Sequence, residues 1–156
     1  MLKTKKAGNS LFARVFGTPQ PEKKVLYTAR VHTTGGRDGS SRSSDGRLDI
    51  KHSPPGSVGV GTNPEQLFAA GWSACFDRAI ALAARQSKVA LGEVTIDAEV
   101  VLHLADAPDY FLSARLIISI PGVDHAVAQT LGRQAEYLCP YSKAMRGNID
   151  VTFNVL

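Results

Sequence analysis

The chain has 156 residues, and its hydrophobic fraction of 44% and charged fraction of 21% are those of a globular protein that can bury a core without disulfides. The net charge of +4 is concentrated in the first 24 residues, and no basic stripe with interleaved aromatic residues indicates a nucleic-acid surface. No apolar run approaches the roughly 20 residues of a membrane-spanning helix. We therefore expect neither nucleic acid nor a membrane as a partner.

The chain contains only two cysteines, Cys75 and Cys139. They fit neither a disulfide-rich secreted domain nor a zinc site of the CxxC type. The four histidines lack the spacing of metal ligands, so we expect no metal and no bound cofactor. Because no secretory apolar segment stands at the N-terminus, a cytoplasmic location is the prediction.

Residues 1–23 are rich in lysine and end in a proline-rich break. We interpret them as an N-terminal extension that is either mobile or docked through a short amphipathic helix at residues 10–16, with a transit peptide as a third reading. Residues 24–156 are predicted to form one domain.

The domain is predicted to begin with two strands, at residues 25–33 and 48–52, joined by a turn-rich segment of Gly, Asp and Ser. A long central helix then runs from Pro64 to about Gln86, with Thr62 or Asn63 as its N-cap. Its middle is made of small residues, which would allow another backbone to approach closely.

Residues 94–104 and 111–120 alternate apolar and polar side chains and are predicted to form a long antiparallel hairpin. Asp124 is the expected cap of a second helix, which ends at Cys139 because Pro140 cannot continue it. After a helical turn, residues 149–155 alternate as a last strand. The sequence thus predicts an α+β fold with antiparallel sheets packed around a long central helix.

The two thiols differ in their predicted surroundings. Cys139 lies at a helix C-terminus, where unpaired carbonyls disfavour a thiolate. Cys75 lies in mid-helix, so a nearby cation is needed to lower its pKa below the value of about 8.5 of a free thiol. Arg78, one turn further on, and Arg37, in a glycine-flanked loop, are both candidates.

Glu65 precedes Cys75 by ten residues, which corresponds to about 15 Å along one helix axis. The two side chains therefore cannot meet within one straight helix. A cluster of Glu65, Arg37 and the thiol requires either that Arg37 bridge a large gap or that two central helices pack antiparallel across a homodimer.

Four sequence blocks resemble the organic hydroperoxide resistance (Ohr) family, which belongs to the superfamily of osmotically inducible protein C (OsmC). They are GGRDG at 35–39, SSDG at 43–46, GTNPEQLFAAGWSACF at 61–76 and CPYSKAMRGNIDV at 139–151. The resemblance covers roughly residues 24–156 and implies an Ohr/OsmC-like fold in an intertwined homodimer.

The resemblance also implies a peroxidase that reduces alkyl and fatty-acid hydroperoxides with electrons from dihydrolipoamide or lipoylated proteins. Cys75 matches the peroxidatic cysteine of the family and Cys139 the resolving cysteine. Arg37 matches the arginine that stabilises the thiolate, and Glu65 matches the acid that holds this arginine.

Three apolar side chains of the central helix, Phe68, Trp72 and Phe76, are expected to line a pocket for the alkyl chain of the substrate. Asp77 follows the reactive cysteine and would raise the thiol pKa unless it pairs with Arg78.

Two other functions remain open from the sequence. One is an OsmC-type peroxidase with the same chemistry and a broader substrate range. The other is a non-catalytic lipid-binding module, in which both thiols would be inert and Arg37 and Glu65 unpaired. A redox-sensing transcription factor is disfavoured, because the sequence has no helix-turn-helix pattern.

Overall fold

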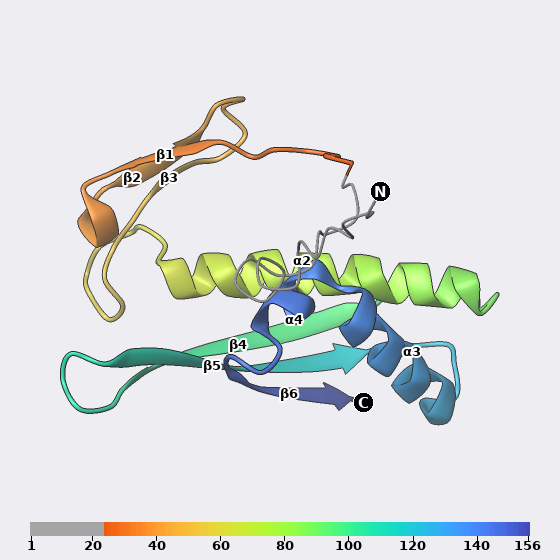
Figure 1. The fold of residues 1–156 in the computed structure, drawn as a ribbon. Coiled ribbons are helices and arrows are strands. Elements are labelled where there is room, and N and C mark those ends of the chain that lie inside the picture. The colour runs from red at the N-terminus through yellow and green to blue at the C-terminus, as the bar shows by residue number, and fades with distance from the viewer. Residues whose placement is uncertain (1–23) are drawn as a thin grey trace, which may run out of the picture.

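The computed structural model describes residues 24–156. The predicted extension, residues 1–23, and the helix considered at residues 10–16 lie outside this part of the chain. Two three-stranded sheets lie on opposite sides of the long helix α2, Pro64–Gln86 (Figure 1). The described fold is thus of the predicted α+β class, with a helix at its centre.

Helix α2 begins and ends where the sequence places it. The side chain of Asn63, the N-cap, accepts a hydrogen bond of 2.8 Å from the backbone N–H of Gln66, and Pro64 occupies the first helical position. Thr62 instead donates a hydrogen bond of 2.8 Å to the Gln66 side chain. Asn63 is therefore the cap, which resolves the two alternatives left by the sequence.

Judged by length and composition alone, α2 could cross a membrane, since its most apolar window has a mean hydropathy of 1.3. The sequence analysis did not expect such a segment. Trp72, Phe76 and Ile80 are nevertheless fully buried in the protein core. A core helix can have the same composition as a membrane span, and 33% of this apolar window is buried inside the protein.

The larger sheet packs against α2 and consists of β4, Thr95–Leu104, β5, Tyr110–Ser119, and β6, Asp150–Val155. Strands β4 and β5 form the predicted antiparallel hairpin, but β6 pairs with β5 in parallel. The sheet is therefore mixed and not purely antiparallel. The reason is the intervening helical segment, which carries the chain back to the end of the sheet at which β5 begins.

This helical segment contains α3, His125–Leu138, and α4, Pro140–Met145. Asp124 stands at the N-cap position of α3 as predicted, although its side chain makes no capping hydrogen bond. The core lies between α2, α3 and the inner face of the larger sheet. Its fully buried large side chains are Trp72, Phe76, Ile80, Leu116, Ile118, Leu131 and Cys139.

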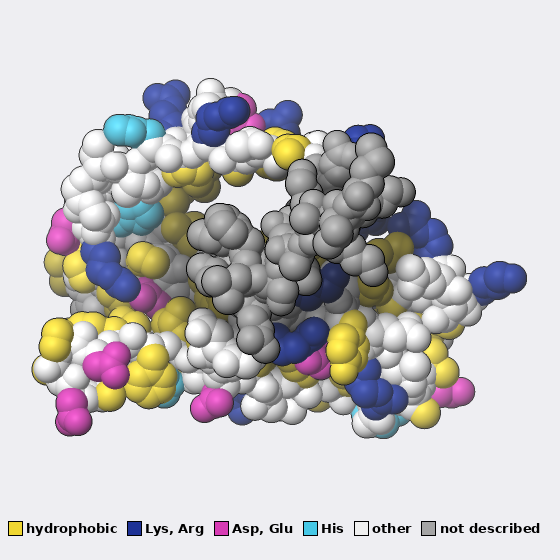
Figure 2. Space-filling model, viewed as in Figure 1, with side chains coloured by type: hydrophobic (Ala, Val, Ile, Leu, Met, Phe, Trp, Pro, Cys, Tyr) yellow, Lys and Arg dark blue, Asp and Glu magenta, His cyan; other side chains and the backbone are white. Residues whose placement is uncertain are grey.

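The smaller sheet consists of β1, Val31–Thr34, β2, Ser40–Ser43, and β3, Asp49–Lys51, with a 3₁₀ turn at Gly36–Asp38. Its first strand is shorter than predicted, because residues 25–30 are not part of a strand, although the carbonyl oxygen of Arg30 accepts a hydrogen bond of 2.9 Å from the backbone N–H of Ser44. All residues of β1 are exposed. In the space-filling view an opening separates part of this sheet from α2 (Figure 2). The smaller sheet is thus an arm that packs little against the other helices and strands of the described chain.

Candidate functional site

The two thiols are in contact. The Sγ atoms of Cys75 and Cys139 lie 3.3 Å apart, and both cysteines are free. Cys139 is fully buried, whereas Cys75 is half-buried and opens onto a cavity. About 1.3 Å of motion would bring the sulfur atoms to the length of a disulfide bond.

Cys139 occupies a position that the sequence describes only in part. It ends α3 as predicted, but it is also the residue from which the short helix α4 begins. Cys139 therefore lies not only at the C-terminal carbonyls of α3, which disfavour a thiolate, but also at the N-terminus of α4. This junction turns the chain so that the Cys139 thiol faces the middle of α2.

Burial raises the pKa of the Cys75 thiol, and the neighbouring Cys139 acts in the same direction. The backbone amide of Tyr141 lowers that pKa, with a smaller effect than burial. In the described protomer, the balance disfavours the thiolate. A reactive thiolate at Cys75 therefore needs a further positive charge.

Arg37 and Glu65 form a two-pronged ion pair. The two guanidinium nitrogens donate hydrogen bonds of 3.0 and 2.6 Å to the two carboxylate oxygens. The hydrogen bond from Arg37 lowers the pKa of Glu65, and the same bond raises the pKa of Arg37. This geometry fixes the plane of the guanidinium group, which is what a site for an anionic atom requires.

The turn that carries Arg37 depends on its glycines. Gly35 has a φ of +72°, and a Cβ atom at Gly39 would lie 1.7 Å from the carbonyl oxygen of Thr34. The backbone N–H of His52 donates a hydrogen bond of 2.9 Å to the carbonyl oxygen of Gly39. The glycine-flanked loop seen in the sequence is therefore a tight turn held by the neighbouring strand end.

The thiol pair and the ion pair are separate within one protomer. Glu65 and Cys75 stand at the two ends of a ten-residue stretch of α2, or about 15 Å along its axis. The structure thus brings the four predicted residues together as two pairs and not as one cluster. Of the two candidate cations, Arg78 is the one that shares a cavity with Cys75.

Within residues 24–156, Asp77 and Arg78 do not form the ion pair that the sequence analysis considered. Asp77 is exposed to solvent. It does not contribute to the pKa shift of Cys75.

The cavity at Cys75 has a volume of about 330 Å³. Its other lining residues come from α2 and from the α3–α4 junction and are Arg78, Ala79, Leu82, Arg85, Leu138 and Pro140. The sequence analysis missed all of them except Arg78. The available signal was helical spacing, because positions 75, 78, 82 and 85 fall on one face of an α-helix.

Trp72 and Phe76 do not line this cavity, which differs from the sequence prediction. The indole N–H of Trp72 donates a buried hydrogen bond of 3.0 Å to Ser142, and the Phe76 ring stacks on Phe153 at a centroid distance of 5.2 Å. Both side chains face the core, one helix face away from the cavity. Phe68 is half-buried and packs on Trp72 at 5.3 Å.

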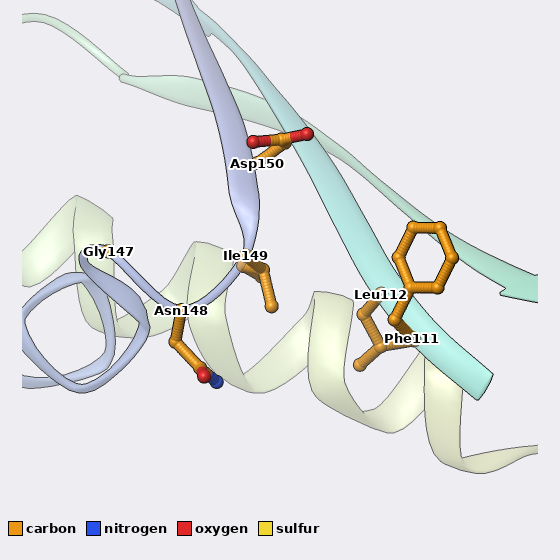
Figure 3. Close-up of a pocket in the computed structure, with 6 residues that line it drawn as sticks. All are labelled: Phe111, Leu112, Gly147, Asn148, Ile149 and Asp150. Carbon is orange, nitrogen blue, oxygen red and sulfur yellow. The ribbon is translucent and has the colours of Figure 1, made fainter. Parts of the chain in front are cut away.

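A second cavity, of about 250 Å³, lies at the far end of the larger sheet (Figure 3). It is lined by Phe111, Leu112, Gly147, Asn148, Ile149 and Asp150. Figure 3 shows Phe111 and Leu112 on opposite faces of β5 and Asp150 directed away from Asn148. Asp150 is the only ionisable side chain among these residues, so this cavity has no group of catalytic residues.

Within residues 24–156, no three His, Cys, Asp or Glu side chains gather as they would around a metal ion. The chemistry available to the described site is that of two neighbouring thiols, an arginine–carboxylate pair and a partly apolar cavity.

The described chain is an α+β protein in which a long central helix presents one thiol to a second thiol at a helix junction, and comparison with known proteins assigns this fold to a family. The OsmC-like protein family matches residues 55–154. The organic hydroperoxide resistance protein of Xanthomonas axonopodis pv. citri is 51% identical over 85% of this chain and 96% of its own length.

Two proteins of Bacillus subtilis support the same assignment. Its organic hydroperoxide resistance protein OhrA is 44% identical over 83% of this chain and 96% of its own length. The crystal structure of its OhrB superimposes with a TM-score of 0.80 at 37% identity, covering 85% of this chain and all of OhrB. The chain therefore belongs to the organic hydroperoxide resistance family of OsmC-like proteins.

Proposed function

We propose that this protein is a thiol peroxidase that reduces organic hydroperoxides to alcohols. The observation that carries the proposal is the contact of a half-buried thiol, Cys75, with a fully buried one, Cys139, beside a cavity. The names of the relatives support the class of substrate. An inert pair of core cysteines would not need an opening onto a cavity.

In the first step, the thiolate of Cys75 attacks the outer oxygen of the hydroperoxide. The O–O bond breaks as the S–O bond forms, the sulfur loses two electrons to the peroxide, and the alkoxide leaves with a proton as an alcohol. Cys75 becomes a sulfenic acid. The more exposed of the two thiols is the appropriate one for this encounter.

In the second step, the Cys139 thiol attacks the sulfenic acid and releases water, which gives a Cys75–Cys139 disulfide. The 3.3 Å contact between the sulfur atoms favours this step over further oxidation of Cys75. A dithiol then reopens the disulfide by exchange and is itself oxidised to a disulfide. The family resemblance suggests dihydrolipoyl groups as this dithiol, in the reducing cytoplasm.

Arg37 is proposed to stabilise the thiolate and the departing oxygen, with Glu65 holding its guanidinium group. Because the ion pair and the thiols lie about 15 Å apart along α2, we assign this role to Arg37 of the partner subunit in a homodimer. The exposed arm formed by β1–β3 supports this arrangement, since it has much surface available to a second copy.

The first experiment is a thiol titration of the reduced protein after one equivalent of cumene hydroperoxide. We expect both thiols to disappear within seconds in the native protein. In Cys139→Ser, the single remaining thiol should form a sulfenic acid that dimedone traps. Cys75→Ser is the matched control and should consume no peroxide.

If both thiols survive the organic peroxide, the peroxidase proposal is wrong. The lipid-binding module would then be the better description. Equal rates with hydrogen peroxide and cumene hydroperoxide would retain the thiol chemistry but remove the preference for organic substrates.

A further inference from the structure

We propose that His52 is a positioning residue for Arg37. Its side chain joins the three strands of the arm beside the turn that carries this arginine, and its backbone fixes that turn relative to the start of α2. The inference rests on the proposed function, in which Arg37 of the partner subunit acts on Cys75, and it names the residue that sets the place of the guanidinium group.

A network of three polar side chains crosses the arm. Thr33 of β1 lies opposite Ser41 of β2, and their hydroxyl oxygens are 2.7 Å apart. The Ser41 oxygen lies 2.6 Å from Nε2 of His52, the residue that follows β3. Thr33 and Ser41 form the second residue pair from the turn at Gly36–Asp38. The network therefore links all three strands close to the turn of Arg37.

The hydrogen bonds of this network run in one direction. Nδ1 of His52 is buried and has no hydrogen-bond partner within residues 24–156. A hydrogen atom on Nδ1 would be a buried donor without an acceptor, so the ring hydrogen is placed on Nε2. His52 then donates to Ser41, and Ser41 donates to Thr33. Because Ser41 is only 6% exposed, water competes little for these bonds.

Stability alone does not explain this network. The Nδ1 atom of His52 is removed from water without a partner, which is unfavourable for folding. A leucine of similar size would avoid this cost. Hydrogen bonds between side chains are directional, and they hold the three strands in one mutual position. The network is therefore better suited to placing the turn of Arg37 than to stabilising the arm.

The backbone at His52 connects the arm to α2. Its N–H donates to the carbonyl oxygen of Gly39, at the end of the turn. The two neighbours of His52 both bond to Thr62, the residue before the N-cap of α2. The N–H of Thr62 donates to the carbonyl oxygen of Lys51 at 3.0 Å, and the N–H of Ser53 donates to that of Thr62 at 2.8 Å. One residue thus stands between the turn of the arginine and the start of the helix.

This link is important because the arm packs little against the other helices and strands of the described chain. The contact of His52 with Thr62 and the ion pair of Arg37 with Glu65 both lie at the N-terminal end of α2. A Cβ atom at Gly61 would lie 2.6 Å from the carbonyl carbon of His52, so the two segments touch closely. Loss of the network would let the guanidinium group shift, and a displacement of about 1 Å can slow a reaction severely.

The test compares two variants of His52. His52→Leu keeps the approximate size of the side chain and removes its hydrogen bond, whereas the amide of His52→Gln can again donate to Ser41. We expect His52→Leu to lower kcat/KM for cumene hydroperoxide about ten-fold. The midpoint of thiolate formation at Cys75, followed by absorbance at 240 nm, should move to higher pH, because the cation is displaced from the sulfur. His52→Gln should recover most of both values, and both variants should melt within a few degrees of the native protein.

A double variant shows whether the effect passes through Arg37. In an Arg37→Ala background, His52→Leu should cause no further loss of kcat/KM, and losses that multiply would contradict the inference. Ser41→Ala breaks the network at its middle and should repeat the effect of His52→Leu, also if that variant does not fold. His125→Leu makes the same replacement at an exposed residue of α3 and is the matched control.

The outcomes separate this inference from the peroxidase proposal. Native values of kcat/KM and of the Cys75 midpoint in both His52→Leu and Ser41→Ala would overturn the inference and leave the peroxidase intact. A lower melting temperature with an unchanged midpoint would make His52 a structural residue of the arm only. A shifted midpoint in a protein that consumes no hydroperoxide would retain the positioning role and reject the peroxidase.

Discussion

The middle and the N-terminal end of α2 differ in how firmly the described chain holds the functional pair that each carries. In the middle of the helix, Cys75 meets a Cys139 thiol that is fully buried in the core. Near the N-terminus, Glu65 meets Arg37, whose side chain is 45% exposed and stands on the arm of β1–β3. The first pair is fixed by the core, and the second depends on a small sheet that is itself poorly covered.

This difference indicates which functional groups a single chain can bring together and which it cannot. A protomer alone can position the two sulfur atoms, but it leaves the Cys75 thiol with a raised pKa. It also builds a precise guanidinium group about 15 Å away along α2, where no thiol of the same chain can use it. No arginine of the described chain lowers the pKa of Cys75, and Arg37 contacts no thiol in it; pairing of two chains would bring the two groups together.

The largest effect should follow from removing the cation. We expect Arg37→Ala to lower kcat/KM for cumene hydroperoxide by about 100-fold, because it removes a donor to the charge that develops on sulfur and oxygen. The midpoint of thiolate formation at Cys75, followed by absorbance at 240 nm, should move to higher pH, since burial of the thiol would then be less opposed.

Arg42→Ala is the matched control, because Arg42 lies on the same sheet in an exposed pair with Asp49 at 3.6 Å. It should change neither kcat/KM nor the midpoint of thiolate formation at Cys75.

Glu65→Gln tests the ion pair through the pH dependence of stability. Arg37 holds the pKa of Glu65 below its ordinary value of 4.5, so the ion pair stabilises the fold above that pH and is lost as the pH falls through the lower, folded value. The difference in melting temperature from the native protein should therefore fade in acid.

A complementation experiment sharpens the same comparison. Cys75→Ser and Arg37→Ala should each be nearly inactive alone. If each site takes its thiol from one chain and its arginine from the other, random mixing after denaturation and refolding should restore about a quarter of the native activity, because half of the dimers carry one intact site of two. Mixtures that stay as inactive as the separate variants would place Arg37 and Cys75 in the same chain.

Much of this fold could be predicted from the sequence, because its signals are local. The Asn63-Pro64 start of α2 and the alternation on both sides of the β4–β5 hairpin each rest on a few neighbouring residues. The parallel pairing of β6 could not be predicted in this way. It depends on where α3 and α4 return the chain, which is a property of the tertiary packing and not of alternation in β6.

The candidate site shows the same limit. Cys75, a thiol in mid-helix, and Arg37, an arginine in a glycine-flanked loop, can be singled out from the sequence. The family resemblance adds their partners, Cys139 and Glu65. Trp72 and Phe76 do not line the cavity at Cys75, because they lie on the face of α2 that meets the sheet, and hydrophobicity alone does not tell which face this is. Arg85 was overlooked because an arginine near a helix C-terminus has an ordinary explanation in the helix dipole.

The smallest expected effect tests whether Trp72 acts on the core side of α2 or in the substrate pocket. Ser142→Ala leaves the buried indole N–H of Trp72 without its acceptor, which should cost about 1 to 3 kcal/mol in the free energy of unfolding. The melting temperature should fall by several degrees. KM for cumene hydroperoxide should stay within about two-fold of the native value, because the change lies on the core side of α2. A several-fold change in KM at unchanged stability would instead return Trp72 to the substrate pocket and make the core face of α2 part of the site.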